Sequence, residues 1–197
     1  SPHRMIPYRS SETGDSLASD NRIESFVVAR LNTTPAFAIY GLGTTAGTGI
    51  EIYYKTLDTG ANGLTNGDWT ETVNNTSAGA FDGNLFVYYP RTNYIYGSRA
   101  GTHIFRYDPD GGDAFNNTYQ ALTHTHVGQG IVHSKDDILY IPYFDSAAPA
   151  SGIARYNATS WNNTALVLPT HYIPTSICEY GNFLAIGCAQ RDGVSNS

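Results

Sequence analysis

Three versions of one short phrase decide the fold of this chain: Asp68-Trp69-Thr70, Ala114-Phe115-Asn116-Asn117-Thr118 and Ser160-Trp161-Asn162-Asn163-Thr164. Their aromatic residues stand at positions 69, 115 and 161, so the phrase recurs at a step of 46 residues. A repeat of this length that is built from short strands is typical of propeller blades and related β-arrays, rather than of a domain with one unique core. The sequence therefore predicts a repeated architecture.

The unit that contains Trp161 has the pattern of four short strands in up-and-down order. Residues 130–133, 138–144, 152–157 and 165–168 are rich in apolar residues, and turns of Gly, Asp, Asn and Pro separate them. This order is the antiparallel meander of one propeller blade. Trp161 marks the corner between the third and fourth strands.

Two earlier units follow the same plan. Their predicted strands are 25–31, 36–42, 49–57 and 70–73 in the first unit, and 85–89, 94–96, 103–108 and 119–122 in the second. Gly101 to Asp108 and Gly152 to Asn157 both run from glycine through apolar residues to Arg-Tyr-Asp or Arg-Tyr-Asn, and Gly49 to Lys55 is a looser copy. The expected fold class is all-β, with four-stranded antiparallel meander repeats of a β-propeller-like kind.

A fourth unit begins but is not completed. Residues 176–180 and 183–188 predict its first two strands, joined by the turn Gly181-Asn182. We therefore expect three full blades and a half blade in a single array over residues 23–197, after an N-terminal extended segment, residues 1–22. An unclosed propeller leaves unpaired edges and half-covered apolar faces. Either the array is truncated at its C-terminal end, which we favour, or other chains complete it.

Composition narrows the choice of partners. Charged residues make up 14% of the chain and the formal net charge is −6, which argues against nucleic-acid binding because phosphate contacts need clustered Lys and Arg. No stretch approaches 18 apolar residues in a row, so we expect no membrane span. Abundant Asn, Thr, Ser and Gly are typical of extracellular or virion surfaces. Acceptor sequences for N-glycosylation, which also arise by chance in such a chain, begin at Asn32, Asn74, Asn75, Asn116, Asn157 and Asn162.

The two cysteines are predicted to be free. If Gly181-Asn182 is a two-residue hairpin turn, Cys178 lies opposite Ala185 and Cys188 lies opposite Thr175. The cysteines are then out of register, point to opposite faces and exceed the reach of a disulfide. We expect both to be buried thiols.

Asp108, Asp110 and Asp113 are the strongest metal candidates. In Asp108-Pro109-Asp110-Gly111-Gly112-Asp113, carboxylates that alternate around glycines can converge on a calcium ion. The segment departs from an EF-hand loop, because glycine follows the second acidic residue directly and no glutamate closes the loop. Proline at the second position and glycine at the fourth also suit an ordinary β-turn, which is the interpretation we favour. We therefore expect no cofactor, and calcium is the alternative that this segment leaves open.

His124 and His126 form the second metal candidate. On a strand these two side chains share one face and can hold zinc or another transition metal. His133 supplies a third ligand if Gly128-Gln129-Gly130 turns the chain back. A polar loop that leads into the third unit is the simpler alternative, and we favour it.

Enzyme signatures are missing from the sequence. It contains no Gly-x-Ser-x-Gly elbow, Walker loop, dinucleotide fingerprint or His-Glu-x-x-His motif. We therefore expect no enzyme. A glycosidase, which needs two carboxylates across a cleft, stays open as an alternative with the candidates Glu51, Asp82, Asp145 and Glu179. Aromatic rings that suit sugar binding occur at Tyr88, Tyr89, Tyr96, Tyr143 and Trp161.

Several segments resemble uncharacterised bacteriophage proteins of the β-propeller repeat type. The resemblance is carried by residues 4–9, Ala38-Ile39-Tyr40-Gly41-Leu42-Gly43, Ile52-Tyr53-Tyr54-Lys55-Thr56 and residues 176–186. Those proteins continue beyond this point and are presumed virion or tail components. The resemblance implies a virion or extracellular location, with other virion proteins or copies of the same chain as partners.

The sequence thus leads to one hypothesis and two alternatives. The hypothesis is a non-enzymatic structural or binding protein of a virion, whose rigid repeats form a platform for assembly contacts or for host-surface glycans. One alternative is a secreted carbohydrate-active propeller enzyme. The other is an extracellular filament or adhesin subunit, in which strand donation from another chain completes the half blade.

Overall fold

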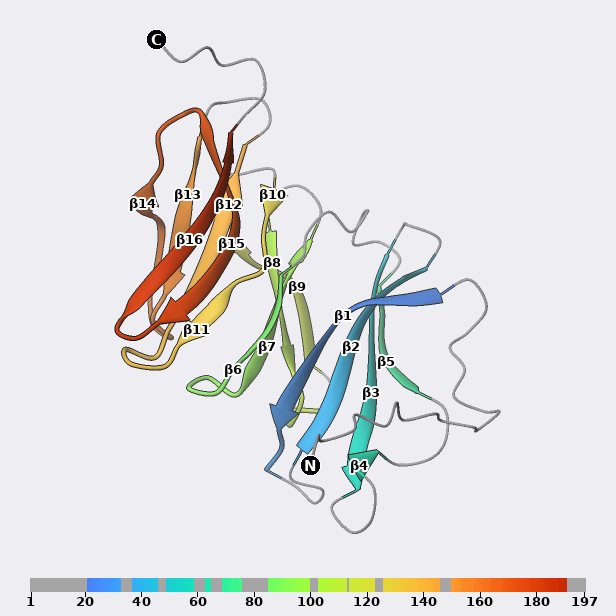
Figure 1. Cartoon of the computed structure of the whole chain (residues 1–197). Helices are drawn as coiled ribbons and strands as arrows, with labels where there is room; N and C mark the ends of the chain where they lie inside the picture. The colour runs from blue at the N-terminus through green and yellow to red at the C-terminus, as the bar shows by residue number, and fades with distance from the viewer. Residues whose placement is uncertain are drawn as a thin grey trace, which may run out of the picture.

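The computed structural model of the chain describes residues 21–32, 37–45, 49–58, 63–64, 69–75, 85–99, 103–112, 114–122, 126–145 and 150–190. Three antiparallel sheets follow one another along the chain, and a two-stranded hairpin comes after them. Figure 1 shows the sheets side by side, with the blue and teal first sheet at one end and the orange third sheet, overlapped by the red hairpin, at the other. The described residues contain no helix, which confirms the all-β prediction.

The first sheet contains β1 (Asn21–Arg30), β2 (Phe37–Thr45), β3 (Ile50–Asp58) and β5 (Thr70–Asn75), and the short β4 (Gly63–Leu64) also pairs with β3. The four long strands correspond to the four predicted strands of the first unit, and β4 was not predicted. The strand β1 begins two residues before the predicted start of the array. The N-terminal segment before it lies outside the described residues.

The second sheet has the order β6 (Phe86–Tyr89), β7 (Tyr94–Arg99), β8 (His103–Asp108) and β9 (Ala114–Ala121). The third sheet contains β11 (Ile131–His133), β12 (Ile138–Phe144), β13 (Ser151–Tyr156) and β14 (Trp161–Val167), and β10 (His126–Val127) pairs with the far end of β12. Both sheets are meanders, as predicted.

The fourth strands are longer than predicted, because they begin at or beside the repeated aromatic residue. Residues Ile104 and Arg106 pair with Gln120 and Asn116, and Ile153 and Arg155 pair with Leu166 and Asn162, so each fourth strand carries a bulge. At each bulge an Asn side chain accepts a hydrogen bond from the backbone N–H two residues on, at 3.1 Å in both sheets. The repeated Asn-Asn-Thr sequence is therefore a bulge motif that lets pairing start early.

The hairpin consists of β15 (Tyr172–Tyr180) and β16 (Phe183–Gln190). Tyr180 pairs with Phe183 across Gly181-Asn182, which confirms the predicted two-residue turn, and Gly181 has the positive φ of 59° that such a turn requires. Its two strands correspond to the first two strands predicted for the fourth unit.

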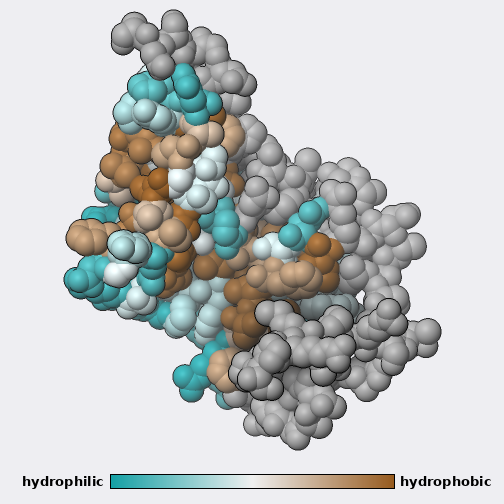
Figure 2. Space-filling model, in the orientation of Figure 1, coloured by the Kyte–Doolittle hydropathy of each residue, from teal (hydrophilic) through white to brown (hydrophobic). Residues whose placement is uncertain are grey.

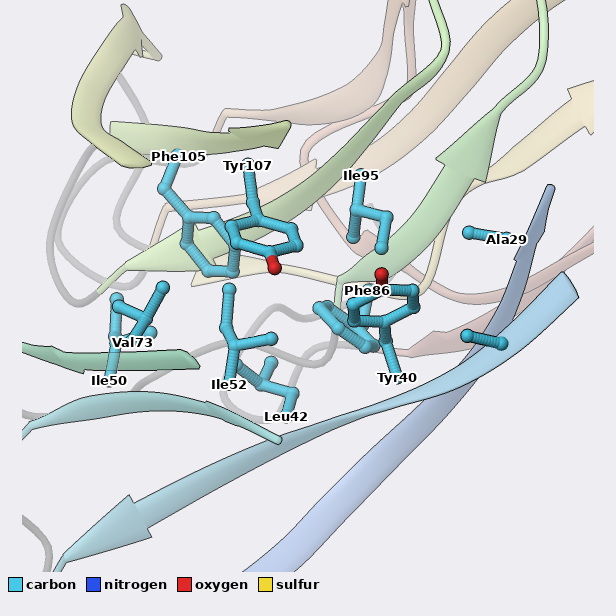
Figure 3. Close-up of a cluster of buried hydrophobic side chains, with 11 residues drawn as sticks. Ala29, Tyr40, Leu42, Ile50, Ile52, Val73, Phe86, Ile95, Phe105 and Tyr107 are labelled. Carbon is cyan, nitrogen blue, oxygen red and sulfur yellow. The ribbon is translucent and has the colours of Figure 1, made fainter. Parts of the chain in front are cut away.

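Alternation along the strands gives each sheet two packing faces. We call the face turned toward the next sheet along the chain the forward face, and the opposite one the rear face. The forward face of the first sheet packs on the rear face of the second, and Figure 3 shows this core. Its buried members are Ala29, Ala38, Tyr40, Leu42, Ile50, Ile52, Val73, Phe86, Ile95, Phe105 and Tyr107.

A second core lies between the second and third sheets. It is mostly aromatic at its centre, where Tyr156 stacks on Trp161 with ring centroids 4.3 Å apart and contacts Tyr96 edge-on at 5.7 Å. Its buried members are Leu85, Tyr89, Tyr96, Ile104, Leu122, Val127, Leu139, Ile141, Tyr143, Ala154 and Tyr156. The second sheet is thus buried on both faces.

A substitution at Gly97 can test this packing, because the ring of Phe105, which lies opposite on the neighbouring strand, packs directly over Gly97. A Cβ at position 97 would overlap the ring, which is fully buried between two sheets. We expect Gly97→Ala to lower the free energy of unfolding by about 1–3 kcal/mol through overpacking. Urea unfolding measures this loss.

The double variant Gly97→Ala/Phe105→Leu provides the control. A smaller side chain at position 105 removes the overlap, so the two substitutions should cost less together than the sum of their separate effects. Strict additivity would contradict the proposed contact.

Candidate functional site

The rear face of the first sheet is apolar and open along β1 and β2. Phe26 is 59% exposed and Val28 is 51% exposed, although they alternate with residues that pack into the core. Phe26 and Trp69 lie with ring centroids 5.9 Å apart, and they line an apolar hollow of about 380 Å³ together with Val28 and Ile39. On β3 the same face carries Tyr53 and is buried there, so the open part is the half built from β1 and β2.

The second open surface is the face of the hairpin that is turned away from the third sheet, and we call it the forward face of the hairpin. Tyr180 and Phe183, paired beside the turn, are 77% and 73% exposed. Cys178 and Ala185 form the next pair on this face and are also exposed. Figure 2 shows apolar surface both over the hairpin and over β1. Apolar surface of this extent is unusual for a monomeric soluble protein and typical of an interaction site.

The rear face of the hairpin packs on the third sheet but covers only part of it. The Glu179 carboxylate accepts a hydrogen bond from the Ser134 backbone N–H, and the Ser151 hydroxyl donates one of 2.5 Å to the Tyr172 carbonyl. Beyond the hairpin, Leu166 of β14 lies on the same face of the third sheet and remains 43% exposed. The two strands of the hairpin therefore leave part of this face uncovered.

A cleft of about 520 Å³ adjoins the open rear face of the first sheet. It lies between the end of β1 and the turn that joins β6 to β7, and its lining combines an aromatic ring, a guanidinium and amides. Its lining residues are Val28, Arg30, Asn32, Phe37, Tyr88, Pro90 and Asn93. Such a mixture of a flat apolar surface and hydrogen-bonding groups suits a polar ligand with hydroxyl groups.

The structure places Asp108 and Asp110 in a hydrogen-bonded turn. The Asp108 carboxylate accepts hydrogen bonds from the backbone N–H groups of Asp110 and Gly111, at 3.1 and 2.9 Å. Asn157 makes the same cap at the equivalent turn of the third sheet, with the N–H groups of residues 159 and 160. These contacts favour the β-turn interpretation of the segment.

Asp110 also joins the first sheet to the second. Its carboxylate accepts a hydrogen bond of 2.9 Å from the Asn32 backbone N–H and one of 2.5 Å from the Asn93 side-chain amide. The Tyr88 hydroxyl in turn donates to the Asn93 carbonyl oxygen at 2.5 Å. The third predicted ligand, Asp113, lies outside the described residues. Among the described residues, no group of three or more His, Cys, Asp or Glu side chains is arranged to hold a metal ion.

The predicted histidine cluster is divided by the fold. The backbone of His126 pairs with Phe144, while its side chain and all of His124 lie outside the described part of the chain. His133 is directed to its own turn, where its Nδ1 lies 2.9 Å from an oxygen of Asp136. The Tyr140 hydroxyl donates to the other oxygen of Asp136 at 2.9 Å. This triad holds the turn between β11 and β12.

Hydrogen bonds lower the pKa of Asp136. Partial burial of the Asp136 carboxyl acts to raise the pKa, but the hydrogen bonds with Tyr140 and His133 outweigh burial and leave the pKa below its ordinary value of 3.8.

The tyrosines that are candidates for sugar binding are mostly core residues. Tyr89, Tyr96 and Tyr143 are buried, and burial raises the pKa of each hydroxyl above its ordinary value. Burial and the hydrogen bond with Tyr119 raise the pKa of Tyr156 to about 12. Of the predicted aromatic set, Tyr88 alone lines the cleft next to the first sheet. The buried tyrosine hydroxyls, whose pKa values are raised, remain neutral at physiological pH.

The carboxylates considered for a glycosidase lie on separate sheets. Glu51 belongs to β3, Asp145 follows β12 and Glu179 belongs to the hairpin, while Asp82 lies outside the described residues. Glu51 instead shares a hydrogen-bonding partner with Glu71, a carboxylate that sequence reasoning missed. The Tyr53 hydroxyl lies 2.5 Å from the Glu51 carboxylate and 3.2 Å from the Glu71 carboxylate. Alternation along β3 places Glu51 and Tyr53 on one face, but only the pairing with β5 brings Glu71 there.

The predicted cysteine environment is partly wrong. Both thiols are free, as predicted, but they are exposed rather than buried. Cys178 lies on the forward face of the hairpin, which nothing in the described chain covers, whereas alternation along β16 places Cys188 on the opposite face. Cys178 lies opposite Ala185, as predicted, whereas Cys188 lies opposite Pro174 rather than Thr175. A bulge between Pro174 and Ser176 shifts the register by one residue.

Comparisons with known proteins find no matching family model, no matching curated protein and no matching solved structure. In the described residues, no helix is long and apolar enough to cross a membrane. The geometry of the surfaces therefore carries the functional argument.

Removal of the Asp110 carboxylate tests its role as a clamp between two sheets. We expect Asp110→Ala to lower the free energy of unfolding by about 1–2 kcal/mol, because two hydrogen bonds to a charged group are lost. Asp110→Asn should lose part of this stabilisation, because the charge is removed and the new side-chain amide faces the donating amide of Asn93. Calcium should leave the melting temperature of the wild-type chain unchanged. A calcium-dependent increase that both variants lose would instead establish a metal site.

The pKa of Asp136 predicts a specific acid sensitivity. Because the folded pKa lies below the unfolded value of 3.8, the stabilisation by this carboxylate is complete above the unfolded value and disappears as pH falls through the folded value. Asp136→Asn should therefore be less stable than the wild type at neutral pH, and the difference should shrink in acid. Urea unfolding at a series of pH values measures it, and a difference independent of pH would contradict this role.

Proposed function

We propose that this chain is a non-enzymatic structural or binding component of a virion, built as a β-propeller-like array of three blades and a half blade. Its stacked sheets act as a rigid platform, and its open sheet faces make assembly contacts. The observation that carries the proposal is the pair of exposed apolar faces at the two ends of the array, marked by Phe26 and Val28 at one end and by Tyr180 and Phe183 at the other.

Three features support a structural role over an enzymatic one. The repeated residues are used in packing and in turn caps, as for Asp108 and Asn157. The buried tyrosine hydroxyls have raised pKa values and are poor proton donors at neutral pH. The exposed surface that stands out is apolar, and assembly contacts bury apolar surface. The virion assignment itself follows from the resemblance to bacteriophage proteins.

Binding of host-surface glycans is a second candidate, supported by the cleft next to the first sheet. Phe37 is 43% exposed there and offers a ring on which a sugar can stack, while Arg30 and the side-chain amide of Asn32 offer hydrogen bonds. A glycan array separates this role from pure assembly, because bound glycan should be lost in both Arg30→Ala and Phe37→Ala.

Purified particles test the virion assignment. An antibody against the recombinant chain should follow virions through a density gradient and label them in immunogold electron microscopy. Recovery of the chain only from the soluble fraction of cells would contradict the proposal. Release of reducing sugar from oligosaccharides by the purified chain would favour the enzyme alternative.

A further inference from the structure

We infer that copies of this chain associate head to tail, with the forward face of the hairpin in one copy packed on the open rear face of the first sheet in the next. The inference rests on the proposed function, because it identifies the partner in the assembly contact as a second copy of the same chain. It follows from a comparison of equivalent positions in successive sheets.

The rear faces of the first and second sheets match position by position. In the second sheet Phe86 lies opposite Gly97, and in the first sheet Phe26 lies opposite Gly41. The next pairs along are Tyr88 with Ile95 and Val28 with Ile39. The aromatic residue at the start of the fourth strand, Phe115 or Trp69, completes each face.

Equivalent positions differ in what covers them. Phe86 is 1% exposed because the first sheet packs on it, whereas the equivalent Phe26 is 59% exposed. Ile95 is fully buried in the same core, whereas the equivalent Ile39 is only half-buried. The first sheet therefore has the same kind of stacking surface as the second, without a sheet on it in the described chain.

The forward faces of the second sheet, the third sheet and the hairpin match in the same way beside their first turns. The closing pair is Tyr89 with Tyr94 in the second sheet, His133 with Ile138 in the third, and Tyr180 with Phe183 in the hairpin. Tyr89 is 0% exposed and His133 is 4% exposed, because each lies against the next element along the chain. Tyr180 and Phe183 are open because no described sheet follows the hairpin.

The widths of the two open faces also match. The exposed part of the first sheet's rear face is the half made by β1 and β2, and the hairpin consists of two strands. A two-stranded hairpin already packs on part of a four-stranded face within the chain, where β15 and β16 lie on the third sheet. The contact between copies would continue the stack of sheets that the chain itself begins.

Aromatic side chains supply most of the area that such a contact would bury. Phe26, Tyr180 and Phe183 are each more than half exposed, and large aromatic side chains bury about 150–250 Å² each when they are fully covered. Because the two faces differ, the interface is heterologous, and copies form a closed ring or an open fibre according to the rotation between them.

Complementation between two variants tests the inference. Phe26→Asp/Val28→Asp removes the first-sheet face, and Tyr180→Asp/Phe183→Asp removes the hairpin face. Substitution of exposed side chains has little effect on stability, and circular dichroism with thermal melting confirms that each variant folds. Thr118→Asp/Thr159→Asp adds the same charge at exposed positions away from both faces and is the matched control.

Sedimentation velocity over a range of concentrations gives the readout. The wild type and the control should associate, each face variant alone should weaken association by about 100-fold or more, and an equimolar mixture of the two should form a one-to-one dimer that does not grow. A wild-type chain that is monomeric at millimolar concentration would overturn the inference. So would a mixture that fails to form the dimer, or association that survives both face variants, which would indicate strand addition at the β16 edge.

The outcome is separable from that of the proposed function. A monomeric chain that is still found on particles would remove the head-to-tail contact and leave the virion role in place. A chain that associates head to tail but is absent from particles would contradict the virion role and leave the head-to-tail contact in place.

Discussion

Alternation of side chains along the strands is the constraint on which the rest of this structure depends. Ile104 and Phe105 are neighbours in sequence and both are fully buried, yet they belong to different cores. The second sheet can bury both only because a sheet lies on each side of it. The same alternation in the first sheet and in the hairpin produces two apolar faces where the described chain offers one neighbour. Open end faces are thus a consequence of the repeat itself.

The repeated phrases contribute to this stacking. Arg106 lies between the rings of Tyr94 and Tyr119, 4.2 and 4.4 Å from their centroids, and supports the forward face of the second sheet. The residue after Arg106 is Tyr107, which packs on the rear face, and Asp108 then caps the turn. One phrase of three residues therefore contributes to both faces and to the corner. Function, in this account, depends on the surfaces that the repeat leaves uncovered.

Local signals predicted most of the strands and their pairing, and tertiary contacts decided what the sequence left open. Period-two patterns and turn residues are sufficient to place the meanders and the Gly181-Asn182 turn. The early start of the fourth strand was missed because it depends on the Asn116 side chain. The thiols of Cys178 and Cys188 were wrongly assigned to the interior, and for Cys178 the reason is that burial depends on whether a sheet covers the forward face of the hairpin. The partners of Asp110 are 78 and 17 residues away in sequence, so no local pattern reveals the clamp.

The most direct test of the central claim is to map which residues face Cys178 when copies associate. A photoreactive maleimide on this exposed thiol, in a chain with Cys188→Ser, can be mixed with a chain labelled with heavy isotopes and analysed by mass spectrometry. The account predicts cross-links from Cys178 of one copy to the segment Phe26–Arg30 and to β2 of the other. Cross-links between two hairpins, or none between copies, would contradict it.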